Sequence, residues 1–243
     1  MRRRAIVWGL LCVLLSALPP AAHADGPVIN VGAMPIAGAA QAFYAQEQGF
    51  FKAAGLDVNL VVLPNGAAIV AAAAAGSVDI GFGSPSPLIQ AHVRGLPVRF
   101  ITYASLYTGP PVTSALMAEP WVSQATDGAR VIGNLNDIVA PRYALAGWFA
   151  TNAWLTANPQ LAQRFIAVMQ QTARWANTHP KEAGALLQRY TKVTPDVAVV
   201  VLKQLQFDDA GRADPKYLQP VVDLISRYGK TPAFNAADLI WSR

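Results

Sequence analysis

Cysteine and histidine are scarce in this 243-residue sequence. Its one cysteine, Cys12, lies in an N-terminal segment that we expect to be removed, so the mature chain would have no disulfide, no thiolate nucleophile and no cysteine metal ligand. Of three histidines, only His92 and His179 would remain, and they are far apart in the sequence. This argues against a zinc site, and we expect no metal and no cofactor.

Charge is also in short supply. Only 14% of the residues are charged, whereas 53% are hydrophobic, which is enough apolar side chain for a substantial core. Three of the 19 basic residues are Arg2, Arg3 and Arg4, and without them 16 basic side chains face 14 acidic ones. Proteins that bind nucleic acid show a strong basic stripe, so the composition argues against that class.

The first 24 residues have the pattern of a secretory signal peptide. Three arginines precede an apolar run over residues 5–18, and Ala22-His23-Ala24 provides the small residues of a cleavage site. The run is short for a helix that crosses a bilayer, and Cys12 lacks the small neighbours of a lipoprotein cleavage box. We therefore expect export to the periplasm with cleavage after Ala24, rather than a membrane or lipid anchor.

Short apolar runs alternate with helical patterns in the first part of the mature chain. We expect strands at residues 28–32, 58–63, 78–83 and 98–105, and helices at 38–54, 67–75 and 87–94. Alternation of this kind with short loops is typical of βαβ units, and it predicts a mostly parallel sheet covered by helices.

Beyond about residue 150 only helices are expected. Asn158-Pro159, Thr194-Pro195 and Asp214-Pro215 each join a capping residue to a proline at the first helical position. The apolar stripes of these helices are interpreted as core packing rather than as a cofactor site.

The segment Gly81-Phe82-Gly83-Ser84-Pro85-Ser86 connects a predicted strand to a predicted helix. It lacks the third glycine of a dinucleotide-binding fingerprint, and no Gly-x-Ser-x-Gly elbow surrounds either serine. A helix start offers unpaired backbone N–H groups that bind anions, and the two serine hydroxyls would add donors. The alternative is that one serine only caps the helix.

Several motifs occur in order along the mature chain. They are residues 46–58 (QEQGFFKAAGLDV), 73–81 (AAAGSVDIG), 91–98 (AHVRGLPV), 118–121 (AEPW) and 143–159. Together they resemble the exported solute-binding receptors of ABC importers of the nitrate, sulfonate and taurine type, the NMT1-like family.

This resemblance implies an α/β, periplasmic-binding-protein-like (type II) fold in which ligand lies between two lobes. Residues 25–110 would form the first lobe, and residues 111–243 the second lobe, the hinge-crossing segment and the C-terminal helices. The implied partners are a small-molecule ligand and the membrane permease of the importer, with no nucleic acid, and we expect a monomer. Fungal members that make a pyrimidine need a cysteine-rich motif that the mature chain lacks, so no catalytic residues are carried over.

The resemblance also implies a set of ligand-binding residues. These are Met34, Pro35, Ile36 and Gly38 after the first strand; Gly83, Ser84 and Ser86 after the third; Tyr103 and Ser105 at the base; Glu119 and Trp121 from the second lobe; and Trp148. For Trp148 a place in the core is the alternative.

The second lobe departs from the family pattern. Residues 113–117 (TSALM) run directly into 118–121, where relatives have further strands and helices, so roughly two βα units of ~30 residues are expected to be missing. The shared Ala-Leu-Met letters suggest an in-frame deletion. A natural short variant and an error in the source sequence are the alternatives.

The predicted function is delivery of a small organic anion (sulfonate-, taurine- or nitrate-like) or a pyrimidine-type compound to an ABC importer. No Lys or Arg falls in the cleft loops, whereas Met34, Tyr103 and Trp121 favour a ligand with an organic part. One alternative is an exported α/β enzyme with a serine or carboxylate active site. The other is a non-functional deleted remnant.

Overall fold

The computed structural model describes residues 27–107 and 139–242. The predicted signal peptide and the junction between Met117 and Ala118 lie outside these residues, so the predictions made for them are not tested by the fold.

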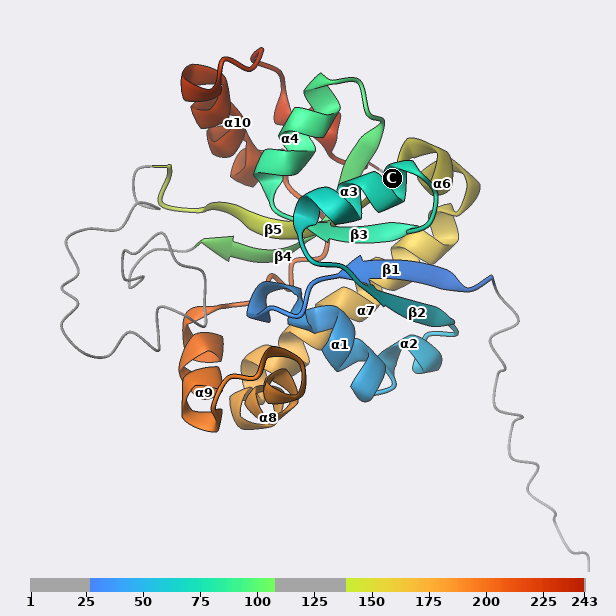
Figure 1. The fold of residues 1–243 in the computed structure, drawn as a ribbon, viewed down its shortest axis with the longest axis vertical. Helices are drawn as coiled ribbons and strands as arrows, with labels where there is room; N and C mark the ends of the chain where they lie inside the picture. The colour runs from blue at the N-terminus through green and yellow to red at the C-terminus, as the bar shows by residue number, and fades with distance from the viewer. Residues whose placement is uncertain (1–26, 108–138, 243) are drawn as a thin grey trace, which may run out of the picture.

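One five-stranded sheet runs through the described part of the chain (Figure 1). Its strands are β1 (Ile29–Ala33), β2 (Val58–Val62), β3 (Ile80–Gly83), β4 (Val98–Tyr107) and β5 (Tyr143–Thr151), in the order β2-β1-β3-β5-β4. β1 pairs in parallel with β2 and β3, whereas β5 is antiparallel to β3 and β4. The four strands predicted before residue 110 are thus confirmed.

Strand β5 was not predicted, although it lies inside the sheet. Seven of its nine residues are buried, on both faces, so polar and apolar side chains do not alternate along it. Its sequence, YALAGWFAT, is rich in Ala and Gly, which are weak strand formers. Neither usual signal of a strand is therefore present.

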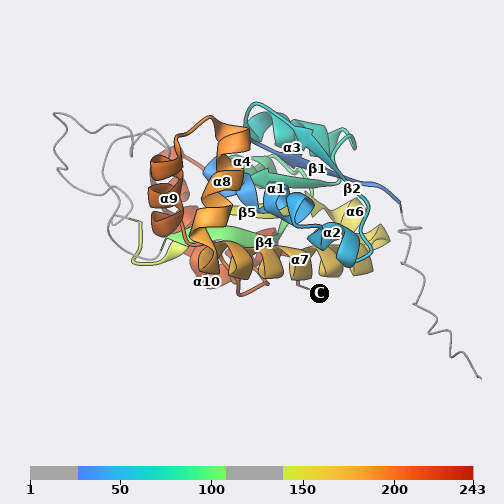
Figure 2. The ribbon, with the colours of Figure 1, turned by 90° about the horizontal axis from the view of Figure 1, so that it is seen from below.

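Helices cover both faces of the sheet. They are η1 (Ala37–Ala39), α1 (Ala40–Glu47), α2 (Phe50–Ala53), α3 (Gly66–Ala74), α4 (Pro85–Val93), α6 (Asn152–Ala157), α7 (Pro159–Thr178), α8 (Pro180–Thr191), α9 (Pro195–Gln204), α10 (Pro215–Gly229) and η3 (Ala236–Leu239). Helices α1, α2 and α7 lie on one face, and α3, α4 and α10 on the other (Figure 1). The α8–α9 pair lies beside α1 and α7 at one end of the molecule (Figure 2).

The single helix predicted over residues 38–54 is wrong in one respect. It is divided into η1, α1 and α2, and Gly49 between α1 and α2 has a φ of 69°. A left-handed residue interrupts the helical hydrogen bonds, and glycine adopts this conformation without steric cost. The chain therefore turns between Glu47 and Phe50 instead of continuing straight.

The core has two parts. The larger fills both faces of the sheet and includes Phe100, Trp148, Phe149 and Phe165, all 0% exposed. The smaller lies between α1, α7, α8 and α9, where Tyr44 packs in one cluster with alanines of α7 and apolar side chains of α8 and α9. The α8–α9 pair thus has its own apolar contacts while being fixed to the main body.

Candidate functional site

The loops after β1 and β3 leave the sheet at the same edge. The two strands are parallel neighbours, with Val31 opposite Ile80 and Gly32 opposite Gly81. The chain then continues to α1 on one face and to α4 on the other (Figure 1). In open α/β sheets, the crevice beyond the carboxyl ends of strands that diverge in this way is the usual ligand site. We call residues 34–38 the β1 loop and residues 83–86 the β3 loop.

The β1 loop provides the first wall. Met34, Ile36 and Gly38 are partly exposed and Pro35 is exposed. The loop is tightened by a hydrogen bond from the Ile36 N–H to the Met34 carbonyl oxygen, 2.9 Å. It therefore presents apolar side chains and backbone, without a charged group, at the edge of the sheet.

The β3 loop provides the second wall. Gly83 ends β3, and Ser84 is the N-cap residue of α4, but its hydroxyl accepts no capping hydrogen bond from the helix. Ser84 and Ser86 are both exposed. Pro85 and Pro87 carry no N–H, so the first turn of α4 offers the N–H of Ser86 together with the two serine hydroxyls as donors for an anion.

The glycines of the β3 segment are needed for packing. A Cβ on Gly81 would lie 2.6 Å from side-chain carbons of both Ile69 and Phe149, and a Cβ on Gly83 would lie 2.6 Å from Leu88. Gly81 and Gly83 thus allow α3, α4 and β5 to pack closely against β3. This accounts for the two glycines that the sequence shares with a dinucleotide fingerprint.

Tyr103 and Ser105, predicted for the base of the site, lie in β4 and are almost completely buried. The Tyr103 hydroxyl donates to the Asp214 carbonyl oxygen, 2.9 Å away, and burial together with Asp214 and Asp208 raises the pKa of Tyr103 far above its usual value. Ser105 pairs with Ala146 of β5 and forms an isolated bridge with Phe207. In this structure both residues join β4 to neighbouring segments and do not face solvent.

Trp148 is likewise enclosed. Its side chain is 0% exposed, and its ring packs edge-on against Phe82 and Phe165 at centroid distances of 5.4 and 5.6 Å. Its indole Nε1–H donates to Oε1 of Gln41, 2.9 Å away. Trp148 therefore has the core position that was the alternative for it.

Gln41 was missed by the sequence analysis. Between Ile36 and Ala45, Gln41 and Tyr44 are the residues with a polar side-chain group, and Gln41 is 0% exposed. A lone amide in such an apolar run, directly after a predicted binding loop, was the signal available. The remaining predicted residues, Glu119 and Trp121, lie outside the described residues and stay predictions.

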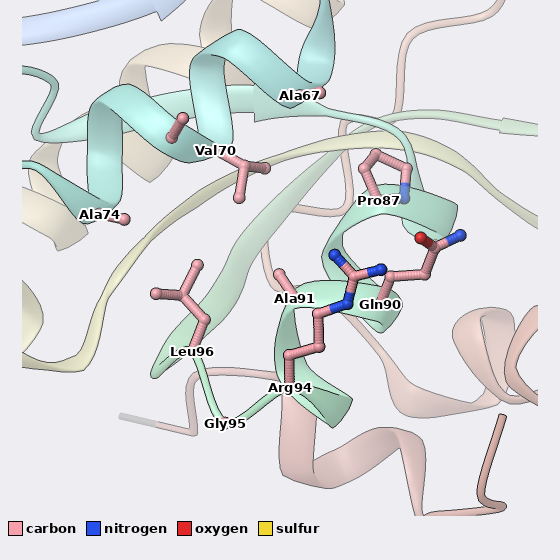
Figure 3. Close-up of a pocket in the computed structure, with 10 residues that line it drawn as sticks. Ala67, Val70, Ala74, Pro87, Gln90, Ala91, Arg94, Gly95 and Leu96 are labelled. Atoms are coloured by element: carbon pink, nitrogen blue, oxygen red, sulfur yellow. The ribbon is translucent and has the colours of Figure 1, made fainter.

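A hollow of about 490 Å³ lies on the surface between α3 and α4, where Pro87, the residue after the β3 loop, is part of its lining (Figure 3). Its lining is mostly alanine and other apolar side chains, with Gln90 and Arg94 as the polar members. It contains none of the predicted site residues.

Two arrangements in the described residues would be relevant to the alternative enzyme, a serine paired with a base and a metal-binding cluster. There, no hydrogen bond joins Ser84 or Ser86 to a histidine or a carboxylate, and no three His, Cys, Asp or Glu side chains form a possible metal site. His92 packs on Phe234, and its pKa is lowered, first by burial and then by the positive charge of Arg99. His179 lies at the start of α8. None of the described helices is long and apolar enough to cross a membrane.

Comparison with known proteins gives a family match over part of the chain and a fold for the whole of the described structure. Residues 37–128 match the family described as NMT1/THI5 like. No curated protein sequence matches the chain.

Several solved structures are similar in fold. The periplasmic aliphatic sulphonate binding protein SsuA from Escherichia coli is 13% identical with a TM-score of 0.72, covering 89% of this chain and 93% of that one. The alkanesulfonate-binding protein SsuA from Xanthomonas axonopodis pv. citri, bound to MOPS, is 13% identical with a TM-score of 0.69, covering 93% and 99%. The periplasmic nitrate-binding protein NrtA from Synechocystis is 13% identical with a TM-score of 0.59, covering 87% and 84%.

These comparisons confirm two predictions. The family resemblance based on the motifs agrees with the family match, and the predicted fold class agrees with the structural neighbours, which are longer than this 243-residue chain. At 13% identity the neighbours establish the fold and nothing finer. Residues 37–128 thus match the NMT1/THI5-like family, and the chain has the α/β fold of periplasmic binding proteins.

Proposed function

We propose that this chain is an exported receptor that delivers a small organic anion, such as a sulfonate, taurine or nitrate, or a pyrimidine-type compound, to the permease of an ABC importer. The observation that carries the proposal is the meeting of the β1 and β3 loops where β1 and β3 diverge to opposite faces of the sheet. The family match and the likeness to sulfonate- and nitrate-binding proteins support it. Export would place the mature chain, beginning after Ala24, in the periplasm, where we expect a monomer.

The chemistry of the two loops favours an anion held without a salt bridge. Neither loop contains Lys or Arg. The N-terminus of a helix carries roughly half a positive charge, and the exposed Ser84 and Ser86 hydroxyls add hydrogen-bond donors. Met34 and Ile36 on the opposite wall are apolar, so a sulfonate with a short organic part fits this pairing better than bare nitrate. We propose Glu119 and Trp121 as contacts from the second lobe.

The chain organisation fits a receptor with an incomplete second lobe. We propose residues 25–110 as the first lobe and residues 111–243 as the remainder. β5, α7 and α10 of the latter pack on the common sheet, whereas α8 and α9 have a core of their own. Three segments meet at Ser105, which pairs with Ala146 and Phe207. This convergence supports a hinge at that point.

A test compares ligand binding by the mature chain and by a Ser84→Ala/Ser86→Ala variant. Taurine, ethanesulfonate, nitrate and uracil are titrated, with binding followed by NMR because contacts from one lobe alone are expected to be weak. We expect one of them to bind, and the double variant to bind it at least tenfold more weakly, since each lost hydrogen bond to a charged group costs about 1.5–3 kcal/mol. Ser77→Ala, at the exposed end of α3, serves as the control. Failure of all four compounds to bind the unaltered chain would count against the proposal.

A further inference from the structure

The carboxamide of Gln41 is buried with only half of its hydrogen-bonding capacity used. Gln41 lies in the first turn of α1 and is 0% exposed. Its Oε1 accepts from the Trp148 indole, 2.9 Å away, whereas its Nε2 has no acceptor among the described residues. Buried polar groups are nearly always paired, because leaving a donor unpaired loses its interaction with water. An unpaired amide here therefore needs an explanation.

The orientation of this amide is determined by its partner. The indole nitrogen of Trp148 can only donate, so the Gln41 atom that faces it must be the oxygen. The NH2 group must then point away from Trp148 with both hydrogens available. The Trp148 ring is in turn held between Phe82 and Phe165, so the indole has little freedom to release the oxygen.

Contacts place this amide against the base of both loops. Phe82, the residue before Gly83, stands opposite Trp148 in the β3–β5 register, and their rings are 5.4 Å apart. A Cβ on Gly38 of the β1 loop would lie 3.5 Å from the ring of Phe82. Gln41 follows Gly38 by one turn of chain, and its carboxamide accepts from the indole of Trp148, which packs on Phe82, so the carboxamide lies close to the strand that carries the β3 loop.

We propose that Gln41 binds the ligand, with its NH2 group donating to an oxygen of an anionic head group, and that Trp148 is the positioning residue that presents this donor. The inference rests on the proposed function and specifies how the site would recognise its ligand. A neutral NH2 donor suits a group whose atoms only accept, such as a sulfonate, and it agrees with the lack of Lys and Arg in the two loops. Ligand entry would require the partly exposed β1 loop to move aside from Gln41.

Tyr44 supplies the competing explanation. Its hydroxyl also has no partner among the residues described, and it lies one turn further along α1. Its ring packs edge-on against Trp175 and Phe207, within the core shared with α7 and α9, which also includes Ala37 of the β1 loop. If a water molecule bridges Gln41 and Tyr44, the amide is structural and has no part in binding.

The test titrates ethanesulfonate and taurine into the mature chain and four variants. Binding is followed by the NMR signals of backbone amides and, where the residue is retained, by those of the Gln41 side-chain amide and the Trp148 indole. For Gln41→Leu we expect affinity to fall at least tenfold, and for Trp148→Phe several-fold with a shifted Gln41 amide signal. The double variant should be no weaker than Gln41→Leu, because Trp148 acts through Gln41. Gln46→Leu, at an exposed position on α1, should bind as the unaltered chain does.

The outcomes separate this inference from the function on which it rests. Equal affinity of Gln41→Leu and the unaltered chain would overturn the role of Gln41 and leave the receptor function standing. If the unaltered chain binds neither compound, the inference is overturned. If nitrate and uracil also fail to bind, the receptor proposal is overturned as well. Should Gln41→Leu not fold, Gln41→Glu retains the shape of the side chain, and its carboxylate should repel the anion and abolish binding.

Discussion

At the scale of single residues, Glu47 links the motif of residues 46–58 to the α8–α9 pair. Its carboxylate accepts from the Tyr190 hydroxyl at 2.5 Å and from the Arg189 guanidinium at 3.0 Å. The Tyr190 ring also packs against Phe43 with centroids 4.5 Å apart. A motif residue expected only to mark the family therefore has a structural role between α1 and α8.

Ionisation of Tyr190 should weaken this link. Burial, and then the hydrogen bond and negative charge of Glu47, raise the pKa of Tyr190 from 10.0 to about 12. The folded state then holds the proton more tightly than the unfolded state, so the stabilisation is complete below pH 10 and is lost between about pH 10 and 12. We expect Tyr190→Phe to remove this part of the pH dependence, as measured by denaturant unfolding across that range. An identical decline in both proteins would assign it to other tyrosines.

Asn177 fixes the segment that returns toward β4. Its Nδ2 donates to the Phe207 carbonyl oxygen at 2.9 Å, and its Oδ1 accepts from the Phe207 N–H at 3.1 Å. Asn177→Ala removes both bonds, and we expect the free energy of unfolding to fall by about 1–2 kcal/mol. Gln163→Ala, exposed on the same helix, is the control and should change it little. Equal stability of the two variants would show that Phe207 is held by packing alone.

At the scale of elements, the packing of α3 and β5 against β3 depends on the absence of side chains at the β3 glycines. Replacing Gly81 with Ala would put a methyl group 2.6 Å from Ile69 and Phe149, and overpacking of this kind costs about 1–3 kcal/mol. Gly66→Ala, where the nearest side-chain atom is 3.8 Å away, should be neutral or stabilising. Thermal unfolding of the two variants measures the difference, and a neutral Gly81→Ala would mean that Phe149 can shift aside.

Elements with a local signal were predictable, and those that depend on distant contacts were not. The first four strands have apolar runs bounded by turns, and Gly55, Gly76 and Gly95 adopt the positive φ expected after helices. Strand β5 has no such signal, because its burial on both faces is imposed by β3 and β4. The pairing of Ile240 with Phe100 likewise joins the chain's end to its middle.

In the candidate site, too, features with a local sequence signal were predictable and features that depend on distant contacts were not. Its two loops followed from strand order and family motifs, whereas the burial of Trp148 and Tyr103 and the role of Gln41 depend on side-chain contacts across the sheet. Sequence spacing places a residue at the end of a strand but does not say whether that residue faces ligand or core.

At the scale of the whole molecule, residues on both sides of the stretch between β4 and β5 pack into one five-stranded sheet with helices on both faces. Only 35 residues separate Tyr107 from Tyr143. If a segment has been deleted between Met117 and Ala118, the opposing jaw of the receptor is incomplete. The proposed ligand then meets the β1 and β3 loops from one side only.

The most direct test of the account is ligand-induced stabilisation of the mature chain into which a relative's missing segment has been inserted between Met117 and Ala118. We expect the restored chain to unfold cooperatively. We also expect ethanesulfonate, taurine, nitrate or uracil, at a concentration of 100 Kd, to stabilise it by about 2.7 kcal/mol, which raises Tm by roughly 5–10 °C. The chain without the insertion should show a smaller shift. If the restored chain melts sharply but no compound changes its Tm, the receptor function is contradicted. If the unaltered chain itself shows a large shift in Tm with a ligand, its short second lobe is natural architecture.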